Sequence, residues 1–86
     1  MKIAADTITN QNAMQVVQTG QSAIRAGDCV IDFSGVIRCD TAAVACVLAW
    51  LRVAHEMGTK LELLAVPDEL RSLAKLYGVS ALINAA

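Results

Sequence analysis

The sequence predicts one small α/β domain with a mixed, mostly parallel sheet and flanking helices. The chain has 86 residues, enough for a single core, so residues 1–86 are expected to form one domain. Apolar residues make up 56% of it and charged residues 17%, against typical values of about 45–50% and about 25%, so we expect an ordered chain. Strand-like and helix-like segments alternate, and short connections between them favour parallel strands joined by right-handed crossovers.

The first third of the chain predicts a short strand and an amphipathic helix. A short strand can form within residues 2–8, of which 2–5 is the better part. A helix is predicted over residues 10–26, because apolar or small residues recur there at helical spacing, at positions 13, 16, 17, 20, 23 and 24. Thr9 or Asn10 suits its N-cap, and Gly27 suits its end.

The central segment predicts a buried strand followed by a long helix. Residues 29–34 read CVIDFS, a β-branched and aromatic run typical of a buried strand. A helix is predicted over residues 41–57. Asp40 suits its N-cap, because the carboxylate can accept hydrogen bonds from the first free N–H groups of the helix.

The last third predicts a second buried strand and a third helix. Residues 60–66 read KLELLAV and are expected to pair in parallel with strand 29–34. A helix follows over residues 67–77. Pro67 suits its first turn, where Asp68 and Glu69 complement the positive end of the helix dipole.

Composition and motifs argue against several functional classes. A net charge of −1 and 3% aromatic residues give no basis for nucleic-acid binding. The longest uncharged apolar run, residues 41–51, is shorter than the about 20 residues that a membrane span needs. Three cysteines without a CxxC motif or secretion signal indicate reduced thiols in the cytoplasm. No metal-ligand cluster, nucleotide fingerprint or nucleophile–base pair is visible, so we expect no metal, no cofactor and no enzymatic activity.

Two aspartates and a threonine are candidates for a functional site. Asp32 lies near the carboxyl end of strand 29–34, while Asp40 and Thr41 open the next helix near the same edge of the sheet. In a purely structural interpretation, Asp40 caps the helix and Asp32 holds the following loop. In a functional one, the Thr41 hydroxyl is exposed and acts as a phosphorylation switch or a partner contact, because a phosphate there would face helix N–H groups.

Helix 41–57 is apolar on two faces, which is unusual for a surface helix. One stripe, expected to face the sheet, consists of Val44, Val47, Leu48 and Leu51. The second stripe consists of Ala43, Cys46, Trp50, Val53 and Met57. We expect the second stripe to dock a partner with Trp50 as its anchor, since tryptophan is enriched at interface hot spots. The alternative is that both stripes are buried.

Two segments resemble a known family. VIDFSGVIRCDTAAVACVLAWL resembles the central segment of STAS domains, and ELRSLAKLYGVSALI resembles the closing helix of the STAS subunit of the Mla phospholipid-transport ABC complex. The resemblance implies a mixed sheet flanked by helices. It also implies a non-catalytic cytoplasmic subunit that binds the ATPase of the transporter and is held at the inner membrane through that complex.

A second branch of the same family offers an alternative. In anti-sigma-factor antagonists, the residue after the motif aspartate is phosphorylated by a partner kinase, and that position is Thr41 here. Antagonists usually have glycine where this chain has Ala43. The N-terminal hairpin of the family is shortened here to one strand candidate, which exposes the sheet edge for pairing and leaves homo-oligomerisation open.

Overall fold

Strands and helices alternate along the chain in the computed structural model, which describes residues 1–81. The strands are β1 (Thr7–Ile8), β2 (Val30–Asp32), β3 (Arg38–Cys39) and β4 (Glu62–Leu64). The helices are α1 (Ala13–Arg25), α2 (Thr41–Glu56) and α3 (Asp68–Leu76). The three predicted helices and the strands within 29–34 and 60–66 are confirmed, with narrower bounds.

The strands of the described chain pair in parallel. β2 pairs with β4 in the register Ile31↔Leu63, and β1 pairs with β3. The segment before β1 lies along the other edge of β2 through a parallel bridge between Lys2 and Asp32. Parallel pairing of β2 and β4 follows from the single crossover helix between them. The antiparallel part of a mixed sheet is not formed among residues 1–81, because a single extended segment takes the place of the hairpin.

The first helix begins later than its apolar pattern predicts. Residues 10–12 form a turn, and Asn12 is the N-cap of α1. The Asn12 side chain accepts a 3.0 Å hydrogen bond from Thr9 N and donates one of 2.6 Å to Thr7 O. These bonds tie the turn back to β1, so helical geometry starts only at Ala13.

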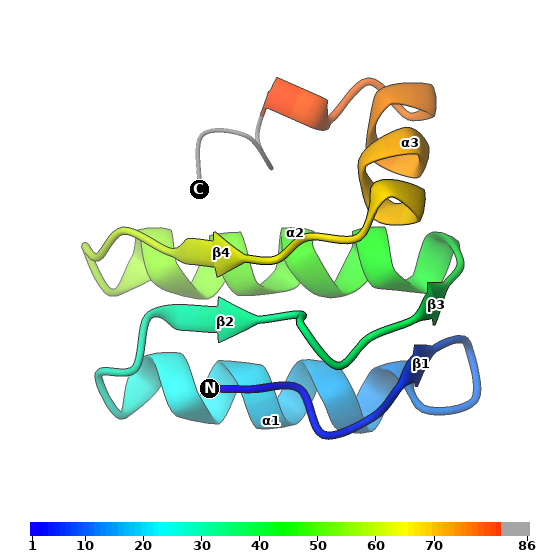
Figure 1. Cartoon of the computed structure of the whole chain (residues 1–86). Helices are drawn as coiled ribbons and strands as arrows, with labels where there is room; N and C mark the ends of the chain where they lie inside the picture. Colours follow the sequence, from blue (N-terminus) through cyan, green and yellow to red (C-terminus); the bar gives the residue numbers. More distant parts are fainter. Residues whose placement is uncertain (82–86) are drawn as a thin grey trace.

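Helices α1 and α2 lie side by side on one face of the sheet, and α3 packs near the end where β3 meets α2 (Figure 1). Alternation along the strands directs Ile31 and Phe33 into the interior, where both are buried. Glu62 and Leu64 have the opposite parity and are exposed. The main core therefore lies between one face of the sheet and the layer formed by α1 and α2.

Trp50 of α2 fills the space between the two helices and the sheet. Its Nε1 donates a 3.1 Å hydrogen bond to Val17 O of α1, and its ring centroid lies 6.1 Å from that of Phe33. Gly20 of α1 faces the indole so closely that a Cβ at this position would lie 2.2 Å from Trp50 Nε1. The absence of a side chain at Gly20 is what lets α1 pack directly on the indole.

The stripe of α2 that was expected to dock a partner is part of this interior. Four of its five residues expose at most 3% of their surface: Ala43, Cys46, Trp50 and Val53. Met57, at the end of α2, is 46% exposed. The prediction of a docking face here is wrong, because α1 already covers the stripe. In the other stripe, Val44 and Val47 are buried, but Leu48 is 37% exposed. Most of both stripes is buried, because the absence of a side chain at Gly20 lets α1 approach α2 closely.

The connections around α3 use left-handed backbone. Ala65, in the loop after β4, has φ of 53° and is the one non-glycine residue with positive φ in the described part of the chain. Gly78 ends α3 with φ of 73°, and Val79 N then donates a 2.8 Å hydrogen bond to Ala74 O. This bond turns Val79 back onto the core, as in a Schellman motif.

Candidate functional site

The N-terminus of α2 is built around Asp40. Its Oδ1 accepts a 2.8 Å hydrogen bond from Ala42 N, which satisfies one of the free N–H groups at the helix start. Thr41 is the first residue of the helix and is exposed. Among the described residues, no hydrogen bond involves the Thr41 hydroxyl. The cap therefore fixes the backbone around Thr41, and the Thr41 side chain is exposed.

Two neighbouring elements fix the start of α2 in space. Asp40 N donates a 3.1 Å hydrogen bond to Ile8 O, which continues the pairing of β1 with β3. From α3, Glu69 Oε1 accepts a 3.2 Å hydrogen bond from Cys39 N. The carboxylates of Asp40 and Glu69 therefore both lie close to the helix start beside Thr41.

Burial and these two carboxylates together shift the pKa of the nearby Cys39 thiol. Burial, reinforced by the negative charges of Glu69 and Asp40, raises the pKa of Cys39 above its usual value of 9.0. A helix N-terminus alone would lower it. The net shift is upward, which disfavours the thiolate, the form in which a cysteine acts as a nucleophile.

Residues 37–41 contribute three exposed side chains to this end of the molecule: Ile37, Arg38 and Thr41. Ile37 is 72% exposed, although its backbone is held by a 2.8 Å hydrogen bond from its N–H to Asp6 O. We call these three residues the Thr41 surface. Sequence reasoning missed Ile37, because an apolar residue between a strand and a helix is expected to be buried. Nothing in the neighbouring sequence shows whether such a residue is buried or exposed.

Asp32 does not join this surface. Its Oδ1 accepts a 2.8 Å hydrogen bond from Ser34 N, and its backbone bonds to Met1 and Ile3. Hydrogen bonds from Ser34, with a smaller contribution from the charge of Lys2, lower the pKa of Asp32. In Figure 1, β2 ends partway along α2, whereas α2 begins beyond β3. These contacts support the structural interpretation, in which Asp32 holds the loop that follows β2.

Two structural features are absent from the part of the chain that the structure describes. No group of three histidine, cysteine or acidic side chains lies together in residues 1–81 in a way that could hold a metal ion. Within the same residues, no helix has the length and apolar character that crossing a bilayer requires.

Comparison with known proteins identifies the class. A family model described as "Mlab, STAS domain" matches residues 4–84. Because the match covers almost the whole chain, the protein belongs to the STAS domain family. Within that family, the description of the matching model points to the MlaB-like branch. No curated protein and no solved structure matches the chain significantly.

Proposed function

We propose that the protein is a non-catalytic STAS-domain subunit of a Mla-type lipid-transport ABC transporter. In this role it binds the cytoplasmic ATPase and supports the assembly and activity of the complex. The proposal is carried by the match of residues 4–84 to the MlaB-like STAS model. It gives the chain a cytoplasmic location, at the inner membrane only through the transporter.

The Thr41 surface is the contact we propose for the ATPase. Interfaces gain affinity from groups that are already rigid when the partner arrives. The cap from Asp40 and the bond from Cys39 N to Glu69 provide that rigidity. Ile37 offers an apolar side chain, and Thr41 offers a hydroxyl that can donate or accept a hydrogen bond. The two carboxylates make the site unfavourable for an additional negative charge.

The test is co-purification with the ATPase subunit of the lipid transporter from the same cell. We expect Thr41→Glu to weaken the complex at least about tenfold, because an unpaired charge buried at an interface costs several kcal/mol. Thr41→Ser keeps the hydroxyl and should bind like the wild type. Thr41→Ala removes the hydroxyl without adding charge, so a loss there would show that the hydroxyl itself makes a contact.

A matched control separates the effect of the position from the effect of the added charge. Gln18→Glu adds the same charge at an exposed position in the middle of α1 and should leave the complex intact. Circular dichroism should show that every variant is folded. If Thr41→Glu and Gln18→Glu both co-purify with the ATPase as well as the wild type does, Thr41 does not lie at the contact.

The exposed Thr41 hydroxyl also favours the second candidate function, an anti-sigma-factor antagonist switched by phosphorylation. In that case the captured partner is a kinase-like anti-sigma factor. Incubation with that kinase and ATP should add one phosphate to the wild type and none to Thr41→Ala, as measured by intact mass spectrometry. Capture of an ATPase with its permease, and no phosphate on the wild type, would leave the transporter subunit as the function.

A further inference from the structure

The two edges of β3 are held by different parts of the molecule. Along a strand, successive backbone N–H groups point to opposite sides. Arg38 N donates a 3.3 Å hydrogen bond to Asp6 O, on the side of β1. Asp40 N donates one of 3.1 Å to Ile8 O on the same side. Cys39 N, between them, points to the other side, where no strand pairs with β3 in the described part of the chain.

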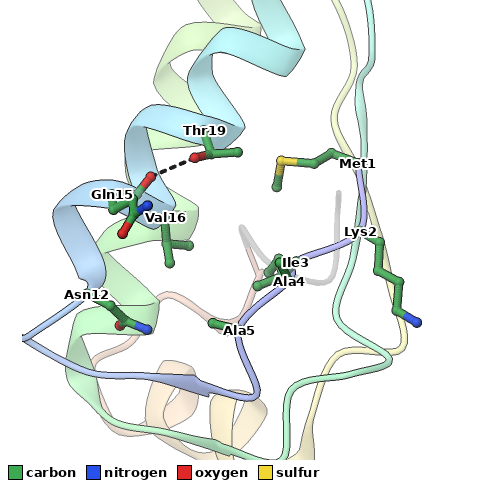
Figure 2. Close-up of a pocket in the computed structure, with 9 residues that line it drawn as sticks. All are labelled: Met1, Lys2, Ile3, Ala4, Ala5, Asn12, Gln15, Val16 and Thr19. Carbon is green, nitrogen blue, oxygen red and sulfur yellow. Dashed lines mark hydrogen bonds between the residues drawn. The ribbon is translucent and has the colours of Figure 1, made fainter.

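The side of β3 that faces β1 is anchored again through α1. Asn12, the N-cap of α1, donates a 2.6 Å hydrogen bond from its side chain to Thr7 O in β1. Figure 2 shows Asn12 beside the groove between α1 and residues 1–5, the segment that leads into β1. This side of β3 is therefore held by strand pairing and, behind that pairing, by a helix.

The opposite side of β3 is held by a side chain of α3, which packs at this end of the molecule (Figure 1). Glu69 Oε1 accepts the 3.2 Å hydrogen bond from Cys39 N. Cys39 is only 4% exposed, so water has little access to this N–H, and a buried N–H without an acceptor is unfavourable. Leu70, next to Glu69, and Ala74, one turn further, are fully buried. Their packing fixes α3 and with it the position from which Glu69 reaches β3.

From these contacts we infer that Glu69 is a positioning residue, through which α3 sets the conformation of the Thr41 surface. The three residues of that surface lie within two positions of Cys39, so a shift of the Cys39 backbone moves all of them. The surface has its binding conformation only while α3 is packed on the core and Glu69 reaches Cys39 N. The inference rests on the proposed function, because it concerns the contact proposed for the ATPase.

Two substitutions separate the reach of Glu69 from its charge. Glu69→Gln keeps an oxygen at the same distance from the backbone and removes the charge. Glu69→Asp keeps the charge but shortens the side chain by a methylene group, which withdraws the oxygen from Cys39 N. Asp68→Asn is the matched control, because it removes the charge of an exposed carboxylate from the same turn of α3.

Hydrogen exchange of the Cys39 amide in the isolated chain, followed by NMR, measures the contact without any partner. We expect exchange about tenfold faster in Glu69→Asp than in the wild type, because the amide loses its acceptor. Glu69→Gln and Asp68→Asn should stay within about threefold of the wild type. Circular dichroism should show that every variant is folded. Unchanged exchange in Glu69→Asp would overturn the inference.

Co-purification with the ATPase subunit tests the consequence for binding. Glu69→Asp should weaken the complex about fivefold or more, whereas Glu69→Gln and Asp68→Asn should bind like the wild type. Wild-type binding by Glu69→Asp, or an equal loss in Glu69→Gln, would overturn the inference, because the carboxylate would then have no effect or act through its charge. Failure of the proposed function gives a different pattern: the wild type captures no ATPase, while exchange of the Cys39 amide still depends on the reach of residue 69.

Discussion

The contact between Gly20 and Trp50 makes Gly20→Ala the most informative substitution in the core. In an ordinary exposed helix position, replacing glycine by alanine stabilises the helix by about 1 kcal/mol. At Gly20 the added Cβ would lie 2.2 Å from Trp50 Nε1 and 2.5 Å from Trp50 Cε2, where a normal contact needs about 3.5–4.0 Å. The indole or the helix must therefore shift by more than an ångström.

Such a shift is costly because the indole is held on two sides. Trp50 Nε1 bonds to Val17 O of α1, and Phe33 packs against the ring. Overpacking of a core costs about 1–3 kcal/mol. Breaking the Nε1 bond would leave a buried donor without a partner, which costs about another 1–3 kcal/mol. After subtracting the gain in helix propensity, we expect Gly20→Ala to lower the free energy of unfolding by about 1–5 kcal/mol.

Urea denaturation followed by circular dichroism in the far ultraviolet measures this change. Ser22→Ala, at an exposed position of the same helix, is the control and should change the free energy of unfolding by no more than about 0.5 kcal/mol. In a Trp50→Phe background, the cost of Gly20→Ala should shrink by about 1 kcal/mol or more, because the two residues touch. If Gly20→Ala instead stabilised the protein by about 1 kcal/mol, the indole would not rest on α1 as described.

Three further predictions concern chemistry and local conformation. Alkylation with iodoacetamide at mildly alkaline pH, read by mass spectrometry, should modify half-buried Cys29 first. Cys39 and Cys46 are buried, and burial raises the pKa of Cys46 to about 11. Rapid modification of Cys46 in the folded protein would contradict this prediction. Hydrogen bonds from Ser34 hold the pKa of Asp32 in the folded protein below its unfolded value of about 3.8. The ionised Asp32 carboxylate therefore stabilises the fold above that pH, and this stabilisation is lost as the pH falls through the folded pKa. Acid unfolding of Asp32→Asn should therefore be less steep than that of the wild type, and identical acid profiles would refute this role. Ala65→Gly should change the free energy of unfolding little. Ala65→Val should lower it by about 1–2 kcal/mol in urea titrations, because a β-branched residue is strained at positive φ. Equal stabilities of the two variants would argue against a left-handed backbone at this residue.

Local signals predicted most of the secondary structure because each has a local physical cause. Asp40 caps α2 through its own side chain, and Gly78 ends α3 with positive φ, so both boundaries were visible in the sequence. The parallel pairing of β2 with β4 follows from the single helix that connects them. In contrast, β1 and β3 have two residues each, too few for an alternating pattern to reveal them.

The candidate site was predictable only in part, because its geometry depends on contacts distant in sequence. The cap by Asp40 is a local interaction and was foreseen. The burial of Trp50 was not, since periodicity shows which residues share a helix face but not which element covers that face. Glu69 was expected to complement its own helix dipole, yet its carboxylate also reaches Cys39 N, 30 residues away. Asp32 was grouped with Thr41 because both were expected near the same edge of the sheet, but its contacts are with Ser34 and the N-terminal segment.

The position of Trp50 has a consequence for optical studies of this protein. It is the only tryptophan in the chain, and its indole is completely buried between α1, α2 and Phe33. Its fluorescence spectrum therefore reports whether the helix layer is seated on the sheet, and it should shift to the red when the core opens to water. Association at the Thr41 surface adds no contact to the buried indole. Intrinsic fluorescence will thus follow unfolding but will not report that association, which needs a reporter attached at the molecular surface.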